Sequence, residues 1–313
     1  MPFPGHGDRV CSCAVKIGST LIDDTFAEAF GMRCARLIIT AYDDHWLRAA
    51  LGELCGYSAS VIACDAEVGI EQPLATDQTP DGRPGASVLA FGFSAKVLTT
   101  AVANRVGQCV MTCPTTAVFD GFPAAEKRLP LGKHLRYFGD GFQKSKRFGD
   151  TRYWRIPVMD GEFLAVETVG IMSGVAGGNL ILQATCQDAA LAAARRASDA
   201  VAAQTRVIAP FPGGVARSGS KVGSVYPGLK ASTADAYCPT LRGRVETRLH
   251  PGVNCAYEIV IDGVDAASVA AAMAQSMRAA AGDRVVAIGA GNYGGKLGKF
   301  HFQLHTLAQP CGC

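Results

Sequence analysis

One acidic residue, Glu258, lies in an almost wholly apolar stretch, CAYEIVIDGV (255–264). A carboxyl group buried among apolar side chains keeps its proton to a higher pH, so it can donate a hydrogen bond or a proton near neutrality. The alternative is that Glu258 takes the solvent side of an edge strand, next to a turn. On the first interpretation Glu258 is a candidate catalytic acid or base.

Glycine-rich loops are concentrated in the second half of the chain. Glycine permits a tight turn, and it also lets the backbone approach a ligand closely. Several such loops at one sheet edge favour a ligand cleft. Ser218, Ser220 and Lys221 offer a possible hold for an anion, without a Walker pattern around them. The candidate substrate-binding residues of these loops are Gly177, Gly178, Asn179, Gly213, Gly214, Ser220, Lys221 and Asn292.

The stretch VVAIGAGNYG (285–294) resembles a strand that runs into the GxGxxG loop of dinucleotide-binding proteins. That loop requires a helix directly after the glycines and an acidic residue about 20 positions further on. The residues that follow alternate instead between apolar and polar types from Lys299 to Thr306, which predicts a strand. We therefore expect a β-hairpin whose turn is made by the glycines, and no dinucleotide site.

The chain contains twelve cysteines, including two C-x-C pairs near its ends, Cys11/Cys13 and Cys311/Cys313. Four thiolates brought together can bind zinc, but the spacing is not C-x-x-C, and frayed termini are the alternative. Cys109 and Cys113 have no adjacent histidine to activate them, so we interpret them as core thiols.

Composition excludes several classes of protein. The net charge of +3 is too small to predict nucleic-acid binding, and no apolar run is long enough for a membrane span. No secretory signal is recognisable, so we expect a cytoplasmic protein. The short basic run Lys144, Lys146 and Arg147 is either a solvated loop or a hold for an acidic ligand.

The order of predicted elements indicates an α/β (α+β) protein of two ferredoxin-like sandwich lobes, residues 1–150 and 151–313. Helices are expected at 43–56, 96–105, 188–203 and 264–281. Strands are expected at 33–41, 60–64, 87–91, 108–113, 153–159, 162–168, 179–184, 206–210, 255–262 and 284–288. The segment 209–240 is a long loop rich in Phe, Val and Tyr, which favours an ordered and functional loop.

A set of blocks in sequence order resembles the formylmethanofuran:tetrahydromethanopterin formyltransferase family. The blocks are DTFAEAF (24–30), ARLIITA (35–41), TPDGRPG (79–85), GQCVMT (107–112), FGDG (138–141), GVAGGN (174–179), APFPGG (209–214), SKVGS (220–224), DAYCPT (235–240), YEIVI (257–261) and AGNYGGKLG (290–298). The resemblance extends from about residue 22 to 305.

The resemblance implies transfer of a formyl group between N5 of tetrahydromethanopterin and the amine of a methanofuran-type coenzyme. It places the catalytic glutamate on Glu258, and it implies a homo-oligomer with no metal and no tightly bound cofactor. Both coenzymes are then substrates in a ternary complex. The glycine loops and the loop 209–240 are expected to form the walls of the cleft.

The charge of the chain departs from that of the strongly acidic archaeal members, and this favours a member from a methylotrophic bacterium. The resemblance then implies a subunit of a formyltransferase/hydrolase complex in formaldehyde oxidation toward formate. A non-catalytic assembly subunit of that complex is the alternative. The ends of the chain, with both C-x-C pairs, are candidate contacts with partner subunits.

Overall fold

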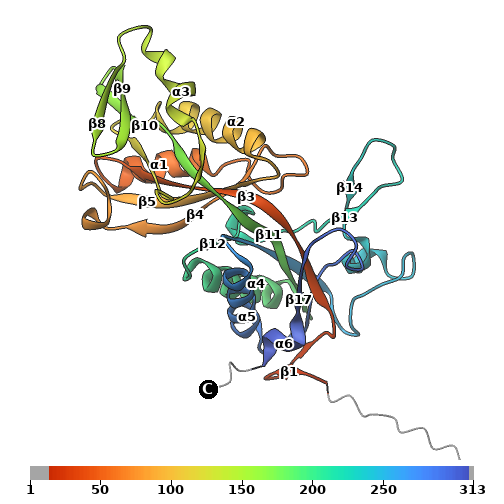
Figure 1. Cartoon of the computed structure of the whole chain (residues 1–313). Coiled ribbons are helices and arrows are strands. Elements are labelled where there is room, and N and C mark those ends of the chain that lie inside the picture. The colour runs from red at the N-terminus through yellow and green to blue at the C-terminus, as the bar shows by residue number, and fades with distance from the viewer. Residues whose placement is uncertain (1–13, 310–313) are drawn as a thin grey trace, which may run out of the picture.

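The computed structural model describes residues 14–309, and it shows a mixed α/β protein of two lobes (Figure 1). Two long antiparallel strands, β3 (Phe26–Thr40) and β11 (Val169–Ala184), run through both lobes. A strand of 15 residues spans roughly 50 Å, enough to cross from one lobe to the other. The two lobes therefore share one continuous sheet, and the predicted fold class, α/β, is confirmed.

The N-terminal lobe is built on the half of β3 that follows Gly31. Its helices pack Leu47, Leu51, Leu98 and Val102 against strand residues such as Val88. Its strands are β4 (Glu67–Leu74), β5 (Gly85–Gly92), β6 (Ala117–Asp120), β7 (Lys127–Leu129), β8 (Lys144–Phe148), β9 (Thr151–Val158) and β10 (Gly161–Val166), and its helices are α1 (Asp44–Leu54), α2 (Ala95–Arg105) and α3 (Leu131–Leu135).

The C-terminal lobe is built on the half of β11 that follows the glycines. There the strands lie in the order β12, β15, β11, β16, β2 and β1, with β17 on the first half of β3. The strands are β1 (Lys16–Ile17), β2 (Thr20–Ile22), β12 (Val207–Ile208), β15 (Cys255–Gly263), β16 (Val285–Gly289) and β17 (Phe300–Gln303), and the helices are α4 (Gln187–Ala202), α5 (Ala266–Ala280) and α6 (Leu304–Ala308). The predicted division at residues 150 and 151 stays a prediction.

Helices α4 and α5 pack against each other on the sheet of this lobe (Figure 1). The buried face of α4 consists of alanines and Val201, and small side chains let the two helices approach closely. Ser276 of α5 donates a hydrogen bond to the Ala197 carbonyl of α4 at 2.8 Å. Asp265 caps α5 by accepting from the Ser268 N–H, as Asp43 caps α1 by accepting from the His45 and Trp46 N–H groups.

Two predicted strands are absent. Residues 60–64 form a turn in which the Ala63 and Cys64 N–H groups donate to the Ser60 carbonyl, and the strand begins later, at Glu67. The second predicted strand, 108–113, falls on a π-helical extension of α2, Val106–Val110, and on the turn that follows it; the extension buries Val106 and Val110 in the core of the N-terminal lobe. In both places the sequence contains a short apolar run, and such a run is compatible with a strand, a buried turn or a buried helix.

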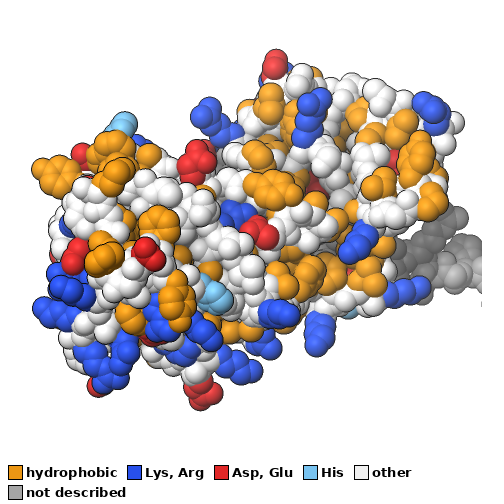
Figure 2. All heavy atoms as spheres, turned by 90° about the horizontal axis from the view of Figure 1, so that it is seen from above, with side chains coloured by type: hydrophobic (Ala, Val, Ile, Leu, Met, Phe, Trp, Pro, Cys, Tyr) orange, Lys and Arg blue, Asp and Glu red, His pale blue; other side chains and the backbone are white. Residues whose placement is uncertain are grey.

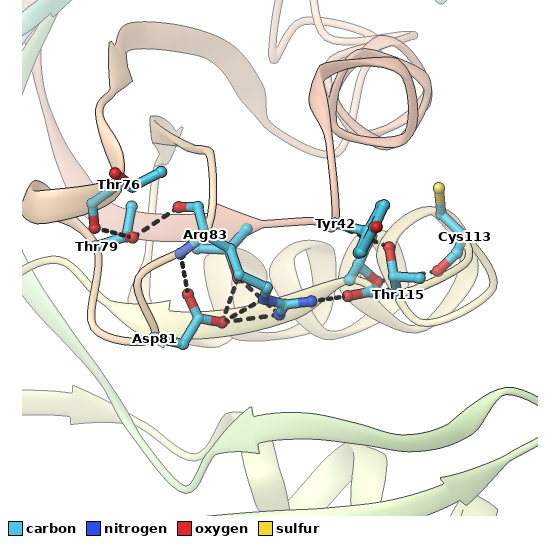
Figure 3. A network of polar contacts seen from close by, with 9 residues as sticks. Tyr42, Thr76, Thr79, Asp81, Arg83, Cys113 and Thr115 are labelled. Carbon is cyan, nitrogen blue, oxygen red and sulfur yellow. Dashed lines mark hydrogen bonds and ion pairs between the residues drawn. The ribbon is translucent and has the colours of Figure 1, made fainter.

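The TPDGRPG block is a structural turn of the N-terminal lobe (Figure 3). Arg83 is paired with Asp81 at 2.8 Å and also donates to the Thr115 carbonyl, which connects the turn to the end of α2 and its extension. Thr79 donates to the Arg83 carbonyl at 2.7 Å. This block stabilises the edge of the N-terminal lobe, away from the elements that hold Glu258.

Charged side chains are spread over both lobes. Figure 2 shows Lys and Arg side chains interspersed with acidic and hydrophobic ones on the face that it displays. The predicted basic loop is the exposed edge strand β8, in which Lys146 lies over the Phe148 ring at 4.7 Å. Within residues 14–309, no helix has both the length and the apolar character of a membrane span.

Candidate functional site

Glu258 lies in the middle of β15, and backbone pairs flank it on both sides. On one side, Glu258 pairs with Ile181 of β11. On the other side the Glu258 N–H donates to the Ala216 carbonyl at 3.0 Å, and the Ala216 N–H donates back at 2.8 Å. Glu258 is therefore not on a free edge, because the start of the long loop pairs with it there.

The Glu258 carboxyl group lies beneath this loop. A Cβ atom at Gly219 would stand 3.7 Å from Glu258 Oε2. Burial raises the pKa of Glu258 to about 7. The residue keeps part of its surface accessible, and no donor within residues 14–309 forms a hydrogen bond with its carboxyl group. The structure thus favours the interpretation of Glu258 as a carboxyl group that gains or loses a proton near neutral pH.

Two tyrosines border Glu258. Burial raises the pKa of Tyr237, and so do the nearby carboxylates of Asp23 and Glu258. Burial likewise raises the pKa of Tyr293, with Glu258 contributing again and the side chain of Ser220 opposing the rise. Around Glu258 therefore lie two parts of the loop 209–240, at Gly219 and at Tyr237, together with the glycine loop at 290–298.

Lys221 lies close by but is already paired. It forms an ion pair with Asp235, which joins the base of the small β13 (Lys221–Val222) and β14 (Ala231–Ser232) hairpin to the following turn. Of the residues predicted to hold an anion, Ser220 lies near Tyr293, the Ser218 carbonyl accepts from Ala234 and Thr233, and the ammonium group of Lys221 closes the loop.

The glycine loop after β16 is not the turn of a hairpin, so that prediction is wrong. Strand β16 pairs with β11 and β2, whereas β17 pairs with β3. Between them the backbone wraps around the carboxylate of Glu28. Its oxygens accept the N–H groups of Tyr293, Gly295, Leu297 and Gly298, at 2.7, 2.9, 2.7 and 2.5 Å. The glycines are needed because φ is positive at Gly294 and Gly295.

Glu28 was missed from the sequence, although it lies in the DTFAEAF block. Its side chain is 1% exposed. Burial by itself opposes ionisation, but the four backbone N–H donors outweigh it and hold the pKa of Glu28 at about 2. In the sequence Glu28 is a polar residue in a strand with alternating residue types. The N–H groups that bind its carboxylate are distant in the chain, so nothing in its local sequence indicates them.

The glycines of GVAGGN lie inside β11, where they form a bulge. Gly177 has φ +91°, and its N–H donates to Asp262 Oδ1 at 2.9 Å. A Cβ atom at Gly178 would stand 2.5 Å from Val269 of α5. The buried Asp262, whose pKa is raised by burial and by the neighbouring Glu67, is a second residue that sequence reasoning missed.

The two asparagines hold the glycine loop. Asn179 accepts the Gly291 N–H at 2.6 Å, and its amide group donates to the Gly291 carbonyl at 3.1 Å. Asn292 donates to Thr25 Oγ1 and to the Phe26 carbonyl, both at 3.1 Å, and it lines a pocket. Asn179 is therefore a support for the loop, and Asn292 reaches the surface at which a ligand can bind.

Gly213 and Gly214 make the turn that leads from β12 toward Ala216. Both have positive φ, and a Cβ atom at Gly214 would stand 2.0 Å from Ser198 Oγ of α4. They fix the path of the chain just before it pairs with Glu258. The C-x-C pairs lie outside the described residues. Among residues 14–309, no group of three or more Cys, His, Asp or Glu is arranged to hold a metal ion.

A partly accessible carboxyl group with a pKa of about 7, next to the turn at Gly219, is suited to acid–base catalysis. Together with the two-lobed α/β fold it defines a class of protein, an enzyme that acts on a small molecule at the surface between loops. The comparisons with known proteins give the family.

Two family models cover the described chain. The model of formylmethanofuran-tetrahydromethanopterin formyltransferase matches residues 15–158, and that of the proximal lobe of the same enzyme matches residues 161–307. The chain belongs to the formylmethanofuran–tetrahydromethanopterin formyltransferase family. The resemblance found in the sequence blocks is confirmed.

The chain is similar to individual members over almost its full length. It is 52% identical to the formyltransferase of Methylobacillus flagellatus, with 93% of this chain and 99% of that protein covered. The enzyme from Methanosarcina barkeri has a solved structure that matches with a TM-score of 0.89 at 44% identity, covering 94% and 100% of the two chains. A chain of the formyltransferase/hydrolase complex from Methylorubrum extorquens, solved with methylofuran, matches with a TM-score of 0.91 at 44% identity, covering 95% and 99%.

Proposed function

We propose that this chain transfers a formyl group between N5 of tetrahydromethanopterin and the amine of a methanofuran-type coenzyme. The single observation that carries the proposal is the Glu258 carboxyl group. It has a pKa of about 7, no hydrogen-bond partner within the described residues, and a position next to Gly219 of the long loop. Membership of the family supplies the two substrates.

The transfer is direct. The amine nitrogen of one coenzyme attacks the formyl carbon carried by the other, and the carbonyl oxygen gains negative charge. Protonated Glu258 donates a hydrogen bond to the developing charge. Glu258 gives its proton to the departing nitrogen as the bond between that nitrogen and the formyl carbon breaks, and the carboxylate so formed takes the proton that the attacking nitrogen loses. The charge of Glu258 is therefore the same before and after the reaction.

Holding both substrates in register supplies much of the remaining rate. Gly219 of the long loop and Tyr293 of the glycine loop after β16 both lie near Glu258. Both coenzymes bind and leave as substrates, and no resident cofactor takes part in the proposed steps. Of the candidate residues, Ser220 lies next to Tyr293, which borders Glu258, and Asn292 precedes Tyr293 in the glycine loop.

We also propose that the chain works as a homo-oligomer and as one subunit of a formyltransferase/hydrolase complex. The similarity to a chain of that complex supports this proposal. In that setting a partner subunit would hydrolyse the formyl group after its transfer to the furan coenzyme. A non-catalytic assembly role has no structural feature in its favour, because the Glu258 carboxyl group stays partly accessible and has no hydrogen-bond partner among residues 14–309.

The test is a two-substrate kinetic study of the purified chain, alone and in the reconstituted complex. Formyl-tetrahydromethanopterin and the furan coenzyme are varied together, and formyl transfer is measured. Double-reciprocal lines that intersect are expected, since both substrates must be bound before reaction. Parallel lines would indicate a covalent formyl-enzyme and contradict direct transfer. No transfer in either preparation would overturn the proposed function.

A further inference from the structure

Two buried carboxyl groups meet between β4 of the N-terminal lobe and β15 of the C-terminal lobe. Glu67, at the start of β4, is 6% exposed, and Asp262, near the end of β15, is fully buried. Their side chains form a hydrogen bond with each other. Glu67 Oε1 also accepts the Val61 N–H at 3.0 Å, and Asp262 Oδ1 accepts the Gly177 N–H at 2.9 Å. Within residues 14–309, no N–H group donates to the remaining oxygen, Asp262 Oδ2.

This contact requires a proton, because two ionised carboxylates in one buried site repel each other strongly. Within the described part of the chain, the charged side chains of the adjoining segments are paired among themselves: Arg36 with Glu71, Arg206 with Asp265 and Arg105 with Asp65. The thiol of Cys34 lies close to Asp262, and burial raises its pKa, so it is neutral. Burial and the Glu67 carboxyl group raise the pKa of Asp262 well above its ordinary value. Asp262 Oδ2 therefore carries the proton and donates it to Glu67.

The hydrogen bond from Gly177 to Asp262 lies at the bulge of β11. The pairing of β11 with β15 shifts between Val175 and Gly178, and φ at Gly177 is +91°, so the Gly177 N–H points out of the regular ladder. A buried N–H group without an acceptor is costly, and Asp262 supplies the acceptor. The bulge therefore depends on the orientation of the Asp262 carboxyl group, which Glu67 holds from the other side.

A continuous set of hydrogen bonds leads from this bulge to the glycine loop after β16. The Gly177 carbonyl accepts from the Asn179 amide group at 3.2 Å. Asn179 in turn accepts the Gly291 N–H at 2.6 Å and donates to the Gly291 carbonyl at 3.1 Å. Gly291 precedes Tyr293 by two residues, and Tyr293 borders Glu258. The carboxyl pair thus lies at one end of a network whose other end is the loop beside Glu258.

We propose that Glu67 and Asp262 are positioning residues that share one proton. With the proton in place, Asp262 holds the Gly177 bulge. Asn179 transmits that position to the glycine loop, and so to Tyr293 beside Glu258. When the proton is lost at alkaline pH, the two charges repel each other, and the bulge and the loop lose this support. The inference goes beyond the proposed function and rests on it only for the kinetic part of its test.

Hydrogen exchange of the Gly177 and Gly291 amides tests the shared proton. The wild type is compared with Glu67→Gln/Asp262→Asn, which keeps a donor facing an acceptor but has no titratable group at the pair. Opening of this junction releases the proton in the wild type alone. The protection of Gly177 in the wild type, relative to the double variant, should therefore fall roughly tenfold per pH unit from about pH 6 to 9.

Gly291 should lose protection in the same direction, because Asn179 connects it to the bulge. Asp150→Asn, which changes an exposed turn residue of the N-terminal lobe, is the control and should follow the wild type at every pH. A ratio of wild-type to double-variant protection that does not change with pH would overturn the shared proton.

Two single variants test the connection to the loop. Asp262→Asn keeps an acceptor for the Gly177 N–H and a donor toward Glu67, so it should retain wild-type protection of Gly291 and wild-type kcat at pH 7. Asp262→Ala removes both groups, and it should lower the protection of Gly291 and kcat by roughly tenfold or more. Equal protection of Gly291 in these two variants would overturn the positioning role.

The exchange measurement is independent of formyl transfer. A wild type that transfers no formyl group would contradict the proposed function, and the protection of Gly177 and Gly291 would still decide this inference. Should Asp262→Ala not fold, the wild type and the double variant decide the positioning role. Gly291 protection that falls with rising pH in the wild type relative to the double variant supports it, and an unchanged ratio at Gly291 overturns it.

Discussion

The carboxylate of Glu28 accepts the backbone N–H of Tyr293 at 2.7 Å, across 265 positions of sequence. Three further N–H groups of the same loop converge on this carboxylate, so one buried negative charge determines the path of the chain past the candidate site. This contact fixes the positions of Tyr293 and Asn292. The glycine loop is therefore organised as a whole, and its shape depends on a residue at the other end of the chain.

Replacing Glu28 with Gln should destabilise the protein. The amide keeps one acceptor oxygen but turns an NH₂ group toward N–H donors, so buried donors lose their partners, at a cost of about 2–3 kcal/mol in the free energy of unfolding. The folded-state pKa of about 2 lies below the ordinary 4.5, so the wild type should lose this stabilisation as the pH falls from about 4.5 toward 2. Denaturant unfolding at pH 7 and at pH 3 measures both effects.

The exposed Glu246→Gln is the control for this measurement. It should match the wild type at both pH values, because its side chain lies at the surface. Equal unfolding free energies for Glu28→Gln and the wild type at pH 7 would show that the four N–H groups do not depend on the charge of Glu28.

Gly219 and Gly223 form a matched pair for the loop over Glu258. Both have positive φ, at +54° and +85°, so alanine costs about 1 kcal/mol of backbone strain at either position. At Gly219 a Cβ atom would also stand 2.6 Å from the Ala234 Cβ, whereas at Gly223 it meets nothing within 4 Å. Gly219→Ala must therefore move the loop. We expect its kcat to fall at least tenfold, with Gly223→Ala near the wild-type rate; equal kcat values would place the loop outside the reaction.

Glu258 should lower the stability of the protein at alkaline pH. Its pKa of about 7 in the folded state exceeds the ordinary 4.5, so between these values the folded state holds a proton that the unfolded state has lost. The free energy of unfolding should therefore fall as the pH rises from about 4.5 to 7. Glu258→Gln has no such dependence, and it should be more stable than the wild type by about 2 kcal/mol at pH 8 and equal at pH 4.

Urea unfolding of the two proteins at pH 4, 6 and 8 measures this difference. The difference in unfolding free energy between Glu258→Gln and the wild type is expected to grow from pH 4 to pH 6 and again from pH 6 to pH 8. A constant gap at all three values would mean that Glu258 ionises at its ordinary pKa, and the burial argument for an acid–base role would then lose its support.

The sequence predicted most helices and strands because their signals are local. Asp43 before α1 and Asp160-Gly161 between β9 and β10 specify a helix start and a hairpin through their immediate neighbours. Glu258 was identifiable for the same reason, since its apolar surroundings are adjacent in sequence. The resemblance to the family was distributed over eleven short blocks, and the comparisons confirm it.

The remaining features depend on contacts between distant segments. The hairpin prediction for residues 285–306 was wrong because strand pairing is decided by which partners are available, and β3 and β2 lie nearly the whole chain length away. Glu28 and Asp262 appear in the sequence as ordinary strand residues, yet the Glu28 carboxylate accepts N–H groups of a remote loop, and Asp262 Oδ1 accepts the Gly177 N–H of β11. Asp23 likewise meets its partner His250, 227 positions later, only in the folded chain.

The most direct test of the central claim is formyl transfer by Glu258→Gln beside the wild type, in whichever assembly the wild type is active. The amide keeps the size of the side chain and can donate a hydrogen bond, but it cannot carry a proton between the two nitrogens. With Glu246→Gln as control and circular dichroism to verify folding, kcat should fall roughly a hundred- to ten-thousand-fold in Glu258→Gln. A Glu258→Gln variant that folds and retains kcat within about tenfold of the wild type would contradict the account.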